Sequence, residues 1–240
     1  MALSIIEVRC SRFWRCSRFW AHPSVGSKPN ISTQSVVCLA GVPGLGRTSA
    51  ALEVVTSLRR LNPNWVYIDS DILFPPQWRA DLSSVTGIPL DTPEYQKLSS
   101  GARGARNGFL SLLVSQGHSV LFTETVPALC NAHESFKERF FSIEFRVIYM
   151  ALEGESRELT VAELRRRLQM RAAKDPDGFG RIDQRKLAEP TFYSGVLETY
   201  ESLVQNAGFE RFILRPSESP KEIAARLLPL ILGLNEEHLE

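Results

Sequence analysis

The chain has 240 residues, of which 43% are hydrophobic and 23% charged, a balance typical of a globular domain of roughly 200 residues plus a tail. Lys and Arg number 28 and Asp and Glu 27, so the formal net charge is +1. This charge excludes a strong overall electrostatic attraction to nucleic acid or to a membrane surface. No apolar run approaches the length of about 18 residues that indicates a membrane span, so we expect none.

Residues 1–35 differ in composition from the rest of the chain. They contain a direct repeat of the hexapeptide Arg-Cys-Ser-Arg-Phe-Trp, with four Arg and one acidic residue, Glu7. This composition is typical of a poorly ordered extension, of a mitochondrial presequence, or of a segment that contacts a membrane surface or a partner. The four cysteines form no C-x-x-C pair and show no zinc spacing, so we interpret them as reduced thiols. We expect a cytoplasmic protein, with a mitochondrial one as the alternative.

From residue 36 onward, β-branched runs alternate with stretches whose apolar residues recur at helical spacing. The predicted strands are 35–41, 64–71, 118–125, 145–152 and 209–216. The predicted helices are 48–61, 93–117, 132–141, 160–174, 190–208 and 219–232. This alternation favours a three-layer α/β domain over residues 36–233, with five mainly parallel strands covered on both faces and a C-terminal tail, 234–240.

Three helix ends carry recognisable capping signals. Gly117 can end the second helix, and Ser219 followed by Pro220 can begin the last one. Thr160, with Glu163 three residues later, predicts a capping box at the start of the helix 160–174.

A glycine-rich turn joins the first strand to the first helix. It fits the pattern G-x-x-x-x-G-K-[ST] except at one position, where Arg47 replaces Lys. Such glycines let bare backbone N–H groups curl around a phosphate at a helix N-terminus, and the Thr48 hydroxyl would bind Mg²⁺. The alternative is a chance glycine turn. The predicted ATP-binding residues are Gly41, Val42, Pro43, Gly44, Leu45, Gly46, Arg47, Thr48 and Ser49.

Arg47 keeps the positive charge and can donate two hydrogen bonds to phosphate oxygens. It is longer than Lys and planar, so it affects the expected rate of turnover more than the expected binding.

Acidic residues stand where the second and third strands end, at the edge of the sheet where a ligand crevice forms. Asp69 and Asp71 alternate with Ser70 and so point to one side of the strand. Asp71, nearer the loop, can accept a hydroxyl proton from an acceptor, unless it is only a solvated strand end. Glu124 ends the third strand and is a candidate to organise Mg²⁺ or to touch the acceptor.

The helix 160–174 and the polar loop after it indicate a helical lid. Arg167 and Arg171 are four residues apart and share one face. Closing such a lid would bring their guanidinium groups to the transferring phosphate and exclude water. The alternative is a solvated basic helix face.

Together, "GVPGLGRT", "YIDSD", "LFTET" and "RLQMR" resemble the small P-loop kinases over residues 36–233. That group includes chloramphenicol phosphotransferase, zeta-toxin-type kinases, polynucleotide 5′-kinases and gluconate-type sugar kinases. The resemblance implies a P-loop NTPase fold, ATP with Mg²⁺, Asp71 as the base, Arg167 and Arg171 in the lid, and "LRPSESPKEIAARL" beside the adenine. Arg47 departs from the pattern of the group.

The segment between Asp71 and the next helix lies where such a kinase builds its acceptor pocket. Its aromatic residues and few charges suit an apolar or drug-sized hydroxyl compound, unless they only pack the loop. The predicted substrate-binding residues are Asp69, Asp71, Phe74, Trp78, Arg79 and Glu124.

The leading hypothesis is ATP-dependent phosphorylation of a hydroxyl group on a small molecule. One alternative is a polynucleotide 5′-kinase, for which Arg103 and Arg106 would supply a basic patch although the net charge gives no support. The other is a nucleotide-binding module without catalysis, because of Arg47.

Overall fold

The central strand, β1 (Ser35–Gly41), is buried along its whole length, as expected for a parallel strand covered on both faces. It pairs in parallel with β3 (Ser119–Glu124) on one side and β4 (Glu144–Leu152) on the other. The edge strands are β2 (Trp65–Asp69), parallel to β3, and β5 (Glu210–Leu214), parallel to β4. The resulting sheet has the order β2-β3-β1-β4-β5, so the predicted five-stranded parallel α/β fold is confirmed.

The computed structural model describes residues 34–69, 92–130, 143–152, 156–174 and 186–233, with positions 136, 138, 140, 154 and 184. Residues 1–33 of the predicted extension, the C-terminal tail and most of the predicted helix 132–141 therefore lie outside the described residues. Cys38 and Cys130, which lie within the described part, are both free. In that part of the chain, no helix has the length and apolar character needed to cross a membrane.

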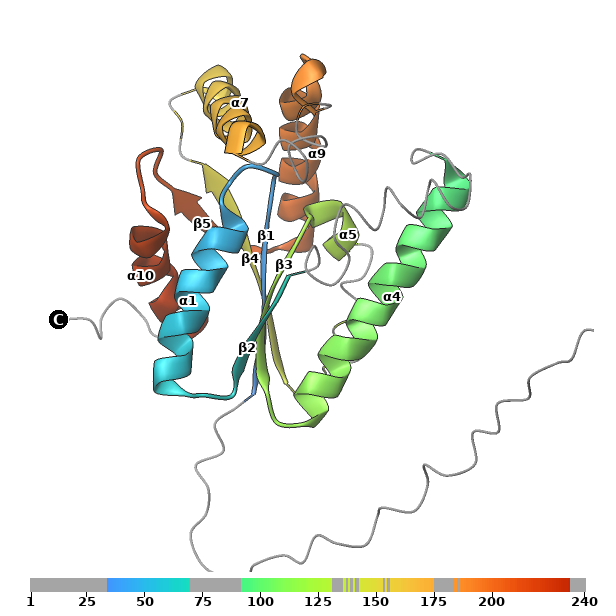
Figure 1. The fold of residues 1–240 in the computed structure, drawn as a ribbon, viewed down its shortest axis with the longest axis vertical. Helices are drawn as coiled ribbons and strands as arrows, with labels where there is room; N and C mark the ends of the chain where they lie inside the picture. The colour runs from blue at the N-terminus through green and yellow to red at the C-terminus, as the bar shows by residue number, and fades with distance from the viewer. Residues whose placement is uncertain are drawn as a thin grey trace, which may run out of the picture. The chain divides into compact units, whose positions relative to one another are not determined.

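Helices cover both faces of the sheet (Figure 1). On one face, α1 (Arg47–Leu61) packs against α10 (Pro220–Ile231). On the other face lie α4 (Pro93–Ser115) and α5 (Val126–Cys130). The helices α7 (Arg157–Lys174) and α9 (Phe192–Ala207) contact each other near the turn from β1 to α1. The domain therefore has three layers, and the turn from β1 to α1 lies at the edge of the sheet where the parallel strands end.

Two of the three predicted helix ends are confirmed. Gly117, with φ 90°, ends α4, and the N–H groups of Gly117 and His118 donate to the carbonyls of Val114 and Leu113. Ser219 caps α10 in a capping box with Glu222, and Pro220 follows it.

The predicted capping box at Thr160 and Glu163 is wrong. Helix α7 begins at Arg157, and the Ser156 hydroxyl accepts a hydrogen bond from the Leu159 N–H (3.3 Å). Thr160 lies inside the helix, where its hydroxyl donates to the Ser156 carbonyl at 3.1 Å. Ser156, four residues before the predicted cap, accepts the hydrogen bond at the start of the helix instead.

The cap of α10 gives a test of local stability. We expect Ser219→Ala to lower the free energy of unfolding by about 1 kcal/mol, because the N–H of Glu222 loses its acceptor. Ser217→Ala, in the same turn and exposed, is the control and should change little. Urea denaturation of the three proteins measures both effects, and equal midpoints would show that the cap contributes nothing.

Candidate active site

The turn from β1 to α1, residues 41–48, is called the glycine loop below. Gly44 and Gly46 have φ angles of 91° and 82°, in the left-handed region that favours glycine. Gly46 is the N-cap residue of α1, and no side chain caps this helix. The first N–H groups of α1 therefore face the loop as an anion-binding site would require.

Helices α7 and α9 hold the glycine loop from outside. A Cβ atom on Gly44 would lie 3.1 Å from the Tyr193 hydroxyl oxygen and 3.4 Å from the Leu164 carbonyl oxygen. The Tyr193 side chain is fully buried, and its hydroxyl donates to the Pro43 carbonyl at 3.1 Å. Gly44 is thus required both by its backbone angle and by the close approach of two helices.

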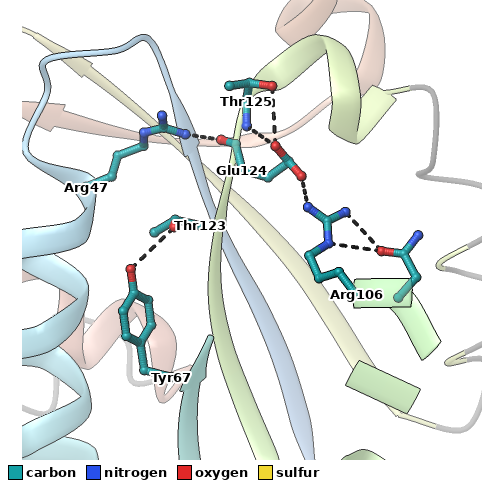
Figure 2. A network of polar contacts seen from close by, with 7 residues as sticks. Arg47, Tyr67, Arg106, Thr123, Glu124 and Thr125 are labelled. Atoms are coloured by element: carbon teal, nitrogen blue, oxygen red, sulfur yellow. Dashed lines mark hydrogen bonds and ion pairs between the residues drawn. The ribbon is translucent and has the colours of Figure 1, made fainter. Parts of the chain in front are cut away.

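The hydroxyl of Thr48 and the carboxylate of Asp69 meet at the carboxyl end of the sheet. Thr48 Oγ1 donates to Asp69 Oδ2 at 3.1 Å, and Tyr67 also donates to Asp69 Oδ2 at 3.1 Å. The Tyr67 hydroxyl lies 3.3 Å from Thr123 Oγ1 (Figure 2). Burial raises the pKa of Tyr67, so this phenol is a neutral donor. Carboxylate and hydroxyl oxygens are the donors that Mg²⁺ prefers, so Thr48 and Asp69 fit this ion.

Glu124 is tied to a buried arginine (Figure 2). Its carboxylate forms an ion pair with Arg106 of α4, and the two side chains are only 9% and 2% exposed. The N–H of Thr125 donates to Glu124 Oε1 at 2.8 Å, and Arg106 also donates to the Asn107 side chain. The sequence had suggested that Arg106 contributes to a basic surface patch for nucleic acid. Arg106 is instead buried, and its charge compensates that of Glu124.

Arg47, the first residue of α1, reaches across to β3. Its guanidinium group donates to the backbone carbonyl of Glu124 (Figure 2). Glu124 thus connects two arginines, with its carbonyl to Arg47 and its carboxylate to Arg106. The guanidinium group of Arg47, which stands where lysine is usual, therefore lies between the glycine loop and the end of β3.

The arginines of α7 have defined partners. Arg167 donates to Glu163 Oε1 at 2.8 Å and to the Pro216 carbonyl at 2.7 Å. Hydrogen bonds from Arg166, and then from Arg167, hold the pKa of Glu163 at about 2, so its carboxylate stays charged at neutral pH. Arg167 therefore joins α7 to the turn between β5 and α10, which the resemblance had placed beside the adenine. Arg171 lies one helical turn further on and is exposed.

Some of the predicted site residues lie within the described part of the chain, and others lie outside it. Asp69 and Glu124 lie at neighbouring strand ends, and the side chains of Val42 and Leu45, which belong to the glycine loop, are buried. The predicted residues that lie outside the described part of the chain are Asp71, Phe74, Trp78 and Arg79. Sequence reasoning missed Tyr67 and Tyr193 as site residues. Tyr67 had a signal, since it stands two residues before Asp69 on the same side of β2.

Comparisons with solved structures identify the fold. A protein assigned as a kinase from Chloroflexus aurantiacus J-10-fl is 12% identical, with a TM-score of 0.51, and the match covers 85% of this chain and 100% of that one. A sugar kinase from Janibacter sp. HTCC2649 is 16% identical, with a TM-score of 0.47 and coverages of 85% and 97%. A shikimate kinase from Acinetobacter baumannii in complex with shikimate is 16% identical, with a TM-score of 0.46 and coverages of 87% and 97%.

The likeness to the Chloroflexus aurantiacus protein shows that the two chains share a fold, that of a parallel α/β sheet covered by helices. No protein-family model matches the chain, and no curated protein sequence matches it either.

Proposed function

We propose that this protein is an ATP-dependent kinase that transfers the γ-phosphoryl group of ATP to a hydroxyl group of a small molecule. The observation that carries the proposal is the glycine loop at the end of the central strand, with the Thr48 hydroxyl bonded to the Asp69 carboxylate. A phosphate cradle and a pair of oxygen donors for Mg²⁺ are thereby adjacent, as phosphoryl transfer requires.

In this proposal the nucleotide extends from the glycine loop to the turn between β5 and α10. The N–H groups of residues 44–49 bind the phosphates. Arg167, which bonds to the Pro216 carbonyl, lies beside the base or the ribose. Arg47 and Arg171 donate to the phosphate oxygens whose charge changes during transfer.

The acceptor hydroxyl gives its proton to Asp71 as its oxygen attacks the γ-phosphorus. The bond from the γ-phosphorus to the β,γ-bridging oxygen breaks, and ADP leaves with that oxygen. Mg²⁺, when bound near Thr48 and Asp69, would neutralise the phosphate charge. The ion pair of Glu124 with Arg106 fixes the end of β3, where the backbone carbonyl receives Arg47.

The acceptor is proposed to bind against residues 72–91, which include Phe74, Trp78 and Arg79. An aromatic segment with few charges supports a small, largely apolar hydroxyl compound. Polynucleotide 5′-kinase activity receives less support, because Arg106 is 2% exposed and paired with Glu124.

A nucleotide-binding module without catalysis remains a second candidate. It is favoured by one observation, the bond from Arg47 to the Glu124 carbonyl, which directs part of the guanidinium group toward the protein. Incubation with ATP, Mg²⁺ and a panel of hydroxyl compounds separates the candidates by ADP formation. Acceptor-dependent ADP formation supports the kinase, whereas binding without it supports the module.

The nucleotide site itself has a direct test. We expect Thr48→Ala to weaken Mg-ATP binding at least about 10-fold, because an oxygen donor to the metal and the bond to Asp69 are both lost. The control is Thr56→Ala on the exposed side of α1, which should bind as wild type does. Isothermal titration calorimetry measures the three affinities. Absence of wild-type binding at millimolar Mg-ATP would remove the basis of the proposal.

A further inference from the structure

Tyr67 makes contacts that its place in the sheet does not require. Tyr67 and Asp69 are two residues apart on β2 and so project to the same face. Thr123 is the register partner of Asp69 on β3. The half-buried phenol reaches both, with its oxygen 3.1 Å from Asp69 Oδ2 and 3.3 Å from Thr123 Oγ1. Packing of the ring against the sheet would not by itself require a hydrogen bond from the Tyr67 hydroxyl to a carboxylate.

Asp69 Oδ2 accepts hydrogen bonds from two hydroxyls that come from different elements. Thr48 approaches from α1 and Tyr67 from β2, both at 3.1 Å. Two donors on one oxygen fix both the side-chain rotamer and the plane of the carboxylate. Asp69 is only 6% exposed, so water competes little for these bonds.

We propose that Tyr67 is a positioning residue that holds the Asp69 carboxylate in the orientation in which it binds Mg²⁺ with the nucleotide. Hydrogen bonds that orient a metal-binding carboxylate typically change metal affinity 10- to 100-fold. This inference rests on the proposed nucleotide site and adds a residue to it. Tyr67 touches neither the nucleotide nor the acceptor in this role, since it acts through Asp69.

The same contacts make Tyr67 distinct from the other tyrosines of the core. Tyr193 bonds to the Pro43 carbonyl and so supports the glycine loop directly. Tyr149 is 2% exposed on β4, next to the central strand but on the side away from β3. Removing the hydroxyl of Tyr149 therefore provides a matched control for the loss of a buried phenol oxygen.

The experiment measures ADP affinity by calorimetry, once with Mg²⁺ and once with EDTA, for wild type, Tyr67→Phe and Tyr149→Phe. The ratio of the two affinities is the enhancement that Mg²⁺ provides. We expect Tyr67→Phe to lower this ratio about 10-fold while its affinity in EDTA stays within about twofold of wild type. Tyr149→Phe should keep the wild-type ratio. Thermal melting without nucleotide checks that each variant is folded.

Thr123→Val supplies a second variant that keeps the Tyr67 ring and removes one neighbour of its hydroxyl. We expect a smaller fall in the same ratio, because the Tyr67 hydroxyl loses its contact with Thr123 but keeps its hydrogen bond to Asp69. This variant also tests the inference if Tyr67→Phe proves unstable.

Three results would overturn the inference. An unchanged ratio in Tyr67→Phe would show that Asp69 needs no help from this hydroxyl. An equal fall in both affinities would mean that Tyr67 supports the shape of the loop rather than the metal site. A fall of the same size in Tyr149→Phe would make the effect one of core packing. If wild type itself gains no affinity from Mg²⁺, the proposed Mg-nucleotide site fails, so the two failures are distinguishable.

Discussion

Asp71→Asn should lower phosphoryl transfer about 100-fold or more while leaving the affinity for ATP near that of wild type. A positioned general base typically contributes a factor of this size, and an amide cannot accept the hydroxyl proton. The chain leaves β2 at Asp69, whose carboxylate is bonded to Thr48 and Tyr67. In the proposed mechanism Asp69 therefore serves the nucleotide side of the site, and Asp71, two positions later in the sequence, is proposed to serve the acceptor.

Single-turnover transfer to an identified acceptor measures the rate, and calorimetry measures the affinity for ATP. Asp69→Asn is the informative comparison, because it should weaken Mg-dependent nucleotide binding, which Asp71→Asn should not. Wild-type turnover in Asp71→Asn would remove this residue from the mechanism. Equal losses of binding in both variants would show that the two carboxylates act together on the metal.

The parts of the fold that depend on local pattern were predictable from sequence. Residues 36–40 of β1 are all apolar, as expected because parallel strands are buried on both faces. The glycine loop was predictable because positive φ angles leave glycine as the favoured residue at positions 44 and 46. Alternation of strands and helices then gives the parallel sheet, since each crossover returns the chain to the same edge.

Side-chain partners in the site were much less predictable, because they come from elements far apart in the chain. Arg106 looked like a surface residue of a helix, yet it is buried against Glu124 of the neighbouring strand. No spacing rule connects Tyr193 to Pro43, 150 positions away, although the bond between them closes α9 onto the glycine loop. Such pairs depend on how helices cross the sheet, which local periodicity does not specify.

The last prediction concerns Arg47, the one residue of the glycine loop that departs from the lysine pattern. We expect Arg47→Ala to lower kcat/KM by a factor that corresponds to about 3 kcal/mol or more, as for other preorganised charge donors. A guanidinium group has five N–H donors, so it can keep its bond to the Glu124 carbonyl and also donate to phosphate oxygens. Alanine removes both the charge and the connection to β3.

Arg47→Lys should keep or raise turnover, because a compact ammonium group fits the curled loop and restores the usual pattern. Arg60→Ala, at the exposed far end of α1, controls for the loss of a positive charge on the same helix. The measurement is kcat and KM for the four proteins with one acceptor. Activity that appears only in Arg47→Lys would identify the native chain as a nucleotide-binding module. Full activity in Arg47→Ala would mean that Arg47 does not touch the transferred phosphate. The arginines of α7, Arg167 and Arg171, would then have to supply that charge.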